Sequence, residues 1–248
     1  MHQFFLNEPL NDDALNAPLV LSRKEYQHLF VLRLRDGEQF VFADGCGREH
    51  VFEVVASDKN TITAKCIETR ASENELACQL VLLQGLPKRE KLEFIIQKSV
   101  ELGAHDILPV MMARSNVRID EKKSERKAER LHEISKSAAS QSKRGIIPEV
   151  HSIQAFASAL DAVSDADIKL IAYEDETSRG TLSALLPTLP QAKKIAILVG
   201  PEGGISDEEW QQAKAHGFQS VSLGKRILRT ETAGLCLLSY LMLHLENA

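Results

Sequence analysis

The sequence predicts an α/β protein with a small N-terminal β-barrel followed by an α/β domain built on a mostly parallel sheet. In residues 1–70, short runs of alternating apolar and polar side chains are separated by turn residues, as in small all-β modules. From residue 78 onward, apolar runs alternate with helical patterns, which indicates a parallel sheet covered by helices on both faces. The polar stretch 71–75 separates the two patterns, so we expect domains at residues 1–72 and 73–248.

The N-terminal module contains a β-hairpin signal. Residues 40–42 form an apolar run that leads into an Asp-Gly pair at 44–45, and residues 51–55 then alternate apolar and polar side chains. An Asp-Gly pair between two such runs is typical of a hairpin turn. Residues 61–66 alternate in the same way and predict a further strand. A Ser-x-x-Glu capping box opens residues 22–33, where apolar side chains recur at helical spacing, so we expect a helix there.

The second domain is expected to contain buried strands separated by helices. Apolar runs that fit buried parallel strands occur at residues 80–83, 107–111, 168–172 and 195–199, with a shorter one at 221–223. Residues 90–102 place apolar side chains on one helical face and precede Gly103, a common helix stop. The final helix, expected at 232–245, is apolar on nearly every side. It must therefore be buried, either in the core or against a partner subunit.

The composition narrows the class of protein. Hydrophobic residues make up 44% of the chain and charged residues 26%, which is typical of a globular protein. No apolar run is long enough to cross a bilayer, and the N-terminus lacks a secretory pattern. The four cysteines show no spacing typical of a zinc site or a disulfide framework. We therefore expect a cytoplasmic protein with reduced thiols, no metal and no membrane association.

Positive charge is concentrated in one segment of an otherwise acidic chain. The net charge is −5, but residues 114–144 carry 10 basic and 5 acidic side chains. Affinity for phosphate depends on such a local field more than on the total charge. This segment therefore indicates RNA binding, with a solvated helix stabilised by i,i+4 ion pairs as the alternative.

Two loops carry the candidate chemistry. The first, Gly-Pro-Glu-Gly-Gly at residues 200–204, follows an apolar strand and precedes a capping box formed by Ser206 and Glu209. Ligands bind outside the carboxyl ends of strands in open α/β sheets, and glycines let a backbone approach a ligand closely. The loop matches no phosphate-binding motif and Glu202 would repel phosphate, so a cationic or neutral ligand is favoured. The alternative is a tight strand-to-helix turn with no ligand.

The second loop lies within residues 222–234 and opens the C-terminal helix. Thr230 or Thr232 is expected to cap that helix, with Glu231 in its first turn, where negative charge is favourable. The apolar and small residues of the loop suit a flat heterocycle held against backbone amides. A purely structural ion pair between Arg229 and Glu231 is the alternative.

Together these loops resemble the signature of the SPOUT methyltransferases and, more narrowly, of the ribosomal RNA small subunit methyltransferase E family. The resemblance extends in order over most of the chain. Its motifs are Gly200-Pro201-Glu202-Gly203-Gly204, Leu223-Gly224-(x)2-Ile227-Leu228-Arg229-Thr230-Glu231-Thr232-Ala233, Leu86-Pro87-Lys88, Ile96-Gln97-Lys98-(x)2-Glu101-Leu102-Gly103, Arg114-Ser115, Ala139-(x)-Gln141-Ser142-(x)-Arg144-(x)3-Pro148 and His28-Leu29-(x)-Val31-Leu32-Arg33. Relatives often carry a basic residue before the first Phe, where this chain has His2-Gln3.

The resemblance implies a specific enzyme. Its N-terminal module would be a PUA-like RNA-binding barrel, and its SPOUT domain would carry a trefoil knot at about residues 195–240, an exception to the rule of unknotted chains. Relatives act as homodimers and use S-adenosylmethionine to methylate N3 of one uridine in the decoding region of 16S rRNA, in the small ribosomal subunit.

Roles for individual residues follow from this chemistry. Uracil N3 is protonated near neutral pH, so its methylation needs a base and a group that stabilises developing negative charge. Glu202 and Glu231 are the candidate carboxylates, and Arg229 is the candidate stabiliser. The cofactor-binding candidates are Leu198, Gly200, Glu202, Gly203, Leu223, Gly224, Ile227, Leu228, Thr232 and Ala233. The RNA-binding candidates are Arg33, Arg35, Lys88, Arg89, Arg114, Lys143 and Arg144.

Three alternatives stay open at this point. The chain could methylate a different rRNA base, or be a non-catalytic RNA-binding factor in ribosome assembly. The presence of both loops, with Glu202 in the first and Arg229 in the second, argues against the non-catalytic factor. A nucleotide-dependent metabolic enzyme is the third class, and the missing phosphate motifs and the small barrel argue against it.

Overall fold

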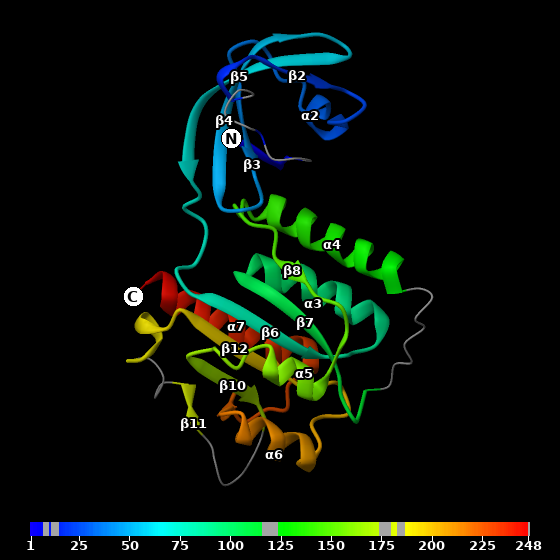
Figure 1. Cartoon of the computed structure of the whole chain (residues 1–248), viewed down its shortest axis with the longest axis vertical. Coiled ribbons are helices and arrows are strands. Elements are labelled where there is room, and N and C mark those ends of the chain that lie inside the picture. The colour runs from blue at the N-terminus through cyan, green and yellow to red at the C-terminus, as the bar shows by residue number, and fades with distance from the viewer. Residues whose placement is uncertain (7–9, 11–14, 116–123, 174–179, 183–186, 248) are drawn as a thin grey trace. The chain divides into compact units, whose positions relative to one another are not determined.

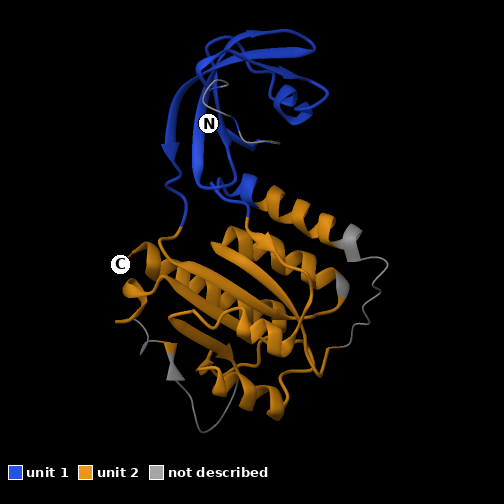
Figure 2. Cartoon of the chain, viewed as in Figure 1, with its two compact units in different colours: residues 1–75, 139–147 blue, residues 76–138, 148–248 orange. Residues whose placement is uncertain are grey.

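The computed structural model describes residues 1–6, 10, 15–115, 124–173, 180–182 and 187–247. The chain forms two compact units (Figure 2). Unit 1 comprises residues 1–75 and 139–147, and unit 2 comprises residues 76–138 and 148–248. The sequence placed residues 139–147 with the second domain, whereas here they belong to unit 1. Local patterns do not reveal this assignment, because it depends on contacts with residues far away in the sequence.

Unit 1 is built on a five-stranded sheet with the strand order β1-β3-β4-β5-β2 (Figure 1). β1 pairs with β3 in parallel, and every other neighbour pair is antiparallel. The strands are β1 (His2–Phe5), β2 (Leu19–Ser22), β3 (Gln39–Ala43), β4 (Arg48–Ser57) and β5 (Thr61–Ala71). The predicted hairpin is confirmed, because β3 and β4 pair across the Asp-Gly turn. The prediction of a small N-terminal β domain is therefore confirmed.

The expected helix of unit 1 is shorter than predicted. α2 covers only Gln27–Val31, and its N-cap, Tyr26, makes no side-chain cap bond. Ser22 ends β2 instead, and its hydroxyl binds Glu25 Oε2 at 2.8 Å within a tight turn. The capping-box pattern thus closes a turn after a strand, so its interpretation as a helix start was wrong. Leu29 of α2 is fully buried in the core of the sheet with Phe40 and other apolar side chains.

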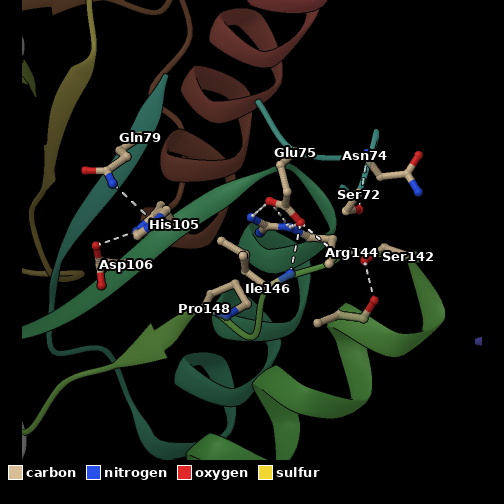
Figure 3. A network of polar contacts seen from close by, with 12 residues as sticks. Ser72, Asn74, Glu75, Gln79, His105, Asp106, Ser142, Arg144, Ile146 and Pro148 are labelled. Carbon is tan, nitrogen blue, oxygen red and sulfur yellow. Dashed lines mark hydrogen bonds and ion pairs between the residues drawn. The ribbon is translucent and has the colours of Figure 1, made fainter. Parts of the chain in front are cut away.

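An ion pair within unit 1 joins residues 139–147 to the end of the N-terminal segment (Figure 3). The Arg144 guanidinium donates to both oxygens of Glu75. Nη2 lies 2.6 Å from Oε2, and Nε lies 3.2 Å from Oε2 and 3.3 Å from Oε1. Glu75 Oε1 also accepts from the backbone amides of Gly145 and Ile146 at 2.8 and 3.2 Å. This cluster explains why residues 139–147 group with unit 1.

Unit 2 contains an eight-stranded sheet in which every neighbouring pair is parallel. The order is β11-β13-β10-β12-β6-β7-β8, with β9 also paired to β7. The strands are β6 (Gln79–Gly85), β7 (Ala104–Met111), β8 (Glu149–Val150), β9 (Gln154–Ala155), β10 (Ile168–Ala172), β11 (Gly180–Thr181), β12 (Lys194–Val199) and β13 (Gln219–Ser222). All five predicted strands are confirmed, although β13 ends before Leu223.

Helices cover both faces of this sheet (Figure 1). α3 (Arg89–Glu101) and α7 (Thr230–Glu246) contact each other, α3 packs on β7, and α7 packs on β6 and β12. α5 (Phe156–Asp161) and α6 (Asp207–Ala215) pack together, and α5 contacts β7. Two further helices of the described residues are α4 (Ser124–Gln141) and the short 3₁₀ helix η3 (Leu189–Gln191). Adjacent residues of a strand face opposite helical layers, so β6 and β12 in the middle of the sheet show continuous apolar runs.

The C-terminal helix buries one face rather than its whole circumference. Its buried side chains include Ala233, Leu237 and Leu241, which lie at helical spacing. On the opposite side Cys236 is exposed, and Leu243 is 54% exposed. The core therefore accounts for the inner face alone, and the outer face keeps apolar surface in contact with solvent. Within the described part of the chain, no helix is long and apolar enough to span a membrane.

Candidate functional site

A cavity of about 520 Å³ lies in unit 2 at the carboxyl ends of β10, β12 and β13. This is the edge where open α/β sheets bind ligands. Both predicted loops contribute to its wall. The lining residues are Arg114, Ala172, Tyr173, Val199, Gly200, Pro201, Glu202, Gly204, Ile205, Asp207, Val221, Leu223, Arg226, Ile227, Leu228, Arg229, Thr230 and Ala233.

The first loop is shaped by close backbone packing. A Cβ on Gly203 would lie 2.8 Å from the Cβ and the carbonyl oxygen of Arg114, so only glycine fits there. The predicted capping box after the loop is confirmed, with Ser206 and Glu209 bonding reciprocally at the start of α6. Glu209 also accepts from the Ala113 amide at 2.7 Å. The loop is therefore held against residues 113–114, and Arg114 becomes part of the cavity wall.

The second loop is joined to the first through Thr230. Its hydroxyl donates to the Gly200 carbonyl at 2.6 Å and accepts from Gln84 Nε2 at 2.9 Å, and both Thr230 and Gln84 are buried. The N-cap of α7 is Arg229, and no side-chain cap bond forms there. The prediction that Thr230 or Thr232 caps this helix was therefore wrong, because the Thr230 hydroxyl is used in a tertiary hydrogen bond. Glu231 does lie in the first turn.

Glu202 and Glu231 share a cation that the sequence did not reveal. Lys91 Nζ on α3 lies 3.3 Å from Glu202 Oε1 and 3.1 Å from Glu231 Oε2. Glu202 Oε1 also accepts from the Lys88 backbone amide at 3.3 Å. Glu231 thus forms its ion pair with Lys91, whereas the alternative interpretation of this loop paired it with Arg229.

This arrangement keeps both carboxylates ionised. Burial alone would raise the pKa of Glu202, but hydrogen bonds from backbone amides and the Lys91 ammonium outweigh it and lower that pKa. The pKa of Glu231 is lowered by the same balance, with a smaller contribution from the charge of Arg229. The hydrogen bond to Glu231 raises the pKa of Lys91 against the opposing effect of burial. All three groups are therefore charged at neutral pH.

Most of the predicted loop residues line the cavity, and some do not. Gly200, Glu202, Leu223, Ile227, Leu228, Arg229 and Ala233 are in the lining. Leu198, Gly203, Gly224, Glu231 and Thr232 are outside it. Leu198 is fully buried in the core on the side of α5 and α6. The alternation of side chains along β12 places its neighbour Val199 at the cavity instead.

Several lining residues were not predicted, and a local signal existed for some of them. Ala172 ends β10 and Tyr173 follows it directly, so the argument that ligands bind at strand ends applied to them as well. Tyr173 stacks on Trp210 with ring centroids 5.3 Å apart, and its hydroxyl donates to Asp207 at 3.4 Å. Asp207 and Arg226 add charge to the wall, and Arg226 lies within the second predicted loop.

The RNA-binding candidates differ in accessibility. Arg33, Arg35 and Lys143 of unit 1 are exposed, as are Lys88 and Arg114 of unit 2. Arg144 is 4% exposed and is occupied by Glu75, so its predicted phosphate contact is replaced by a structural role. The side chain of Arg89 and residues 116–123 of the basic segment lie outside the described part of the chain.

One group of described side chains has metal-ligating atoms close together: Asp106, Glu149 and His151. His151 Nε2 lies 3.2 Å from Asp106 Oδ1, and His151 Nδ1 lies 3.3 Å from Glu149 Oε1. His105 Nδ1 is 2.8 Å from Asp106 Oδ2 (Figure 3). The hydrogen bond to Asp106 raises the pKa of His151, although burial opposes it. Hydrogen bonding and ion pairing of His151 with the two carboxylates therefore account for the proximity of these side chains.

The chain is similar to known RNA methyltransferases along nearly its whole length. Residues 74–242 match the family described as "RNA methyltransferase domain", and residues 21–66 match "RNA methyltransferase PUA domain". It is 36% identical over 244 residues to ribosomal RNA small subunit methyltransferase E of Bacillus subtilis, covering 96% of this chain and 95% of the relative. It is 33% identical to the Mesomycoplasma hyopneumoniae protein of the same name, covering 96% and 98%.

A solved structure agrees with this relationship. The crystal structure of ribosomal RNA small subunit methyltransferase E from Neisseria gonorrhoeae, bound to S-adenosyl methionine, has a TM-score of 0.80 and 33% identity. The match covers 97% of this chain and 96% of that one. The predicted PUA-like N-terminal domain and parallel α/β methyltransferase domain are therefore confirmed, whereas the trefoil knot remains a prediction. By sequence and by fold, this chain belongs to the ribosomal RNA small subunit methyltransferase E family.

Proposed function

We propose that this protein transfers a methyl group from S-adenosylmethionine to N3 of one uridine in 16S rRNA of the small ribosomal subunit. The observation that carries the proposal is the cavity at the carboxyl ends of β10, β12 and β13, enclosed by the two loops of the family signature. Family membership supports an rRNA substrate, and the relative from Neisseria gonorrhoeae binds S-adenosyl methionine.

The residues of the cavity fit this cofactor. Its volume of about 520 Å³ is within the usual range for small-ligand sites, roughly 300–1,000 Å³. Val199, Ile205 and Leu223 supply apolar surface for an adenine ring. Glu202 and Asp207 supply negative charge for cationic groups of the ligand. When bound, the cofactor supplies an electrophilic methyl carbon on a sulfonium, and this transfer needs no metal.

In the proposed mechanism the protein binds the uracil and removes the proton from its N3 atom. Glu202 is the better-placed proton acceptor, because it is ionised and lines the cavity, whereas Glu231 lies outside the lining. Its lowered pKa makes Glu202 a weak base, so developing charge on the uracil ring must also be stabilised. Arg229 is exposed at the cavity and can donate to the uracil oxygens as negative charge builds up.

RNA binding is assigned to exposed basic side chains in both units. The exposed candidates can reach phosphate: Arg33, Arg35 and Lys143 of unit 1, and Lys88 and Arg114 of unit 2. The target uridine must be unstacked to enter the cavity. We further propose a homodimer that covers the outer face of α7, and a cytoplasmic location, where ribosomal RNA is modified.

The proposal is tested with purified protein, radiolabelled S-adenosylmethionine and unmethylated small subunits, with protein-free 16S rRNA in parallel. Methylation at N3 blocks the Watson–Crick edge, so we expect reverse transcription to stop at a single uridine, whose modification mass spectrometry then identifies. A methyl group on another atom or base would refute the N3 assignment. RNA binding without methyl transfer on either substrate would instead indicate a non-catalytic assembly factor.

A further inference from the structure

Three segments that are distant in the sequence meet at the side chain of Lys91. Lys91 lies in the first turns of α3, Glu202 lies in the first loop, and Glu231 lies in the first turn of α7. The ammonium binds both carboxylates, at 3.3 and 3.1 Å. Lys91 and Glu231 are outside the cavity lining, so Lys91 reaches the site through Glu202, which lines the cavity.

The two loops are also held together without Lys91. The buried Thr230 hydroxyl donates to the Gly200 carbonyl and accepts from Gln84, which joins the first loop to the start of α7. The Lys88 backbone amide independently holds Glu202. Loss of the Lys91 charge therefore leaves the hydrogen bonds that fix the loop backbones in place. A substitution that removes only the Lys91 charge can therefore separate an electrostatic role of Lys91 from a structural one.

The electrostatic role follows from the two carboxylates around one cation. Carboxylates that share a site disfavour each other's ionised form, and a cation between them removes that penalty. The side chains of Lys91, Glu202 and Glu231 are 28%, 24% and 18% exposed, so solvent screens the interaction only in part. A lysine in this position fixes the orientation of both carboxylates and keeps both ionised.

We propose that Lys91 is a positioning residue for methyl transfer, which holds Glu202 toward the cavity as an ionised proton acceptor with Glu231 as its paired anion. This inference rests on the proposed function. The lowered pKa of each glutamate and the raised pKa of Lys91 agree with it. A purely structural Lys91 would instead affect folding and cofactor binding, with no change in the pH at which activity appears.

The test uses the full chain with three substitutions. Lys91→Met removes the charge and keeps the length, and Lys91→Arg keeps the charge. Lys98→Met is the matched control, because Lys98 on the same helix forms an ion pair with Glu101 at 2.8 Å, and neither residue lines the cavity. For each protein we would measure thermal stability, cofactor affinity and the single-turnover methylation rate at saturating cofactor across pH.

We expect Lys91→Met to fold normally, bind cofactor within a few-fold of the parent and methylate up to about ten-fold more slowly at the acidic end of the profile. Its acidic limb should move to higher pH by on the order of one unit, as when a carboxylate loses a neighbouring cation. Lys91→Arg should restore the parental limb, and Lys98→Met should match the parent. An unchanged profile in Lys91→Met, or losses of stability and rate that Lys91→Arg does not rescue, would overturn the proposal.

A measurement without turnover separates this inference from the proposed function. Carbon-13 labelling of the glutamate carboxyls allows Glu202 and Glu231 to be titrated by NMR in each protein. Both should titrate at higher pH in Lys91→Met than in the parent, even if the parent methylates no rRNA. Parental titration curves in Lys91→Met would refute the role of Lys91, whereas an inactive parent with shifted curves would refute only the proposed function.

Discussion

Replacing Arg144 with methionine should destabilise the protein, although the sequence suggested a surface RNA contact. Arg144 is 4% exposed and Glu75 is 19% exposed, and the guanidinium donates to both carboxylate oxygens. Removing one partner of a buried pair costs about 3–5 kcal/mol. In Arg144→Met the Glu75 carboxylate keeps its bonds from the Gly145 and Ile146 amides and some solvent contact, so the lower end applies. About 3 kcal/mol corresponds to a fall in Tm of roughly 6–12 °C for a chain of this size.

The assay is chemical and thermal denaturation, with the neighbouring Lys143→Met as control. Lys143 is exposed, so its substitution should leave Tm unchanged and weaken RNA binding, with a shallower salt dependence. Arg144→Met, at a temperature where it remains folded, should bind RNA nearly as well as the parent. The reasoning would be refuted if Arg144→Met kept the parental Tm while losing RNA affinity, because Arg144 would then serve RNA rather than unit 1.

Three further outcomes are expected. Arg229→Ala should lower the single-turnover rate by roughly 10²–10³ with little change in cofactor affinity, and Arg229→Lys should recover only part; lost affinity with a normal rate would contradict this. Burial opposes ionisation of Asp106, but hydrogen bonds from neighbouring histidines outweigh it and lower its pKa, while the pKa of His151 is raised. The lowered pKa of Asp106 adds stability that is lost as pH falls, and the raised pKa of His151 adds stability that is lost as pH rises. Both contributions are present between about pH 4 and 6.5. Asp106→Asn should therefore lower the free energy of unfolding most in that range. Denaturation from pH 3 to 9 checks this, and a pH-independent difference would exclude it. Leu243→Arg should convert a dimeric parent into a folded monomer by light scattering at micromolar concentration; a monomeric parent would refute the proposed dimer.

Local sequence patterns determined the elements whose stabilising contacts are themselves local or periodic. The runs at 80–83 and 195–199 predict β6 and β12 well, because a strand buried on both faces is apolar at successive positions. The Ser206–Glu209 capping box is confirmed because its bonds join residues three positions apart. The ligand edge also followed from sequence, since strands in a parallel sheet place their carboxyl ends together.

The pairing of charged and polar side chains depends on tertiary contacts that local patterns do not reveal. Lys91 meets Glu231 across 140 positions, and Arg144 meets Glu75 across 69. Ser22 and Thr230 both fitted helix caps by sequence, but one closes a turn after a strand and the other binds the Gly200 carbonyl. A charged or hydroxyl side chain can form ion pairs or hydrogen bonds of similar energy with many partners, and the local sequence pattern does not select among them. Local sequence patterns therefore predicted the hairpin of unit 1, the long strands of unit 2 and both loops of the site, but not β1, β2, β8, β9 or β11. Tertiary contacts select which cations bind the carboxylates and which stay exposed.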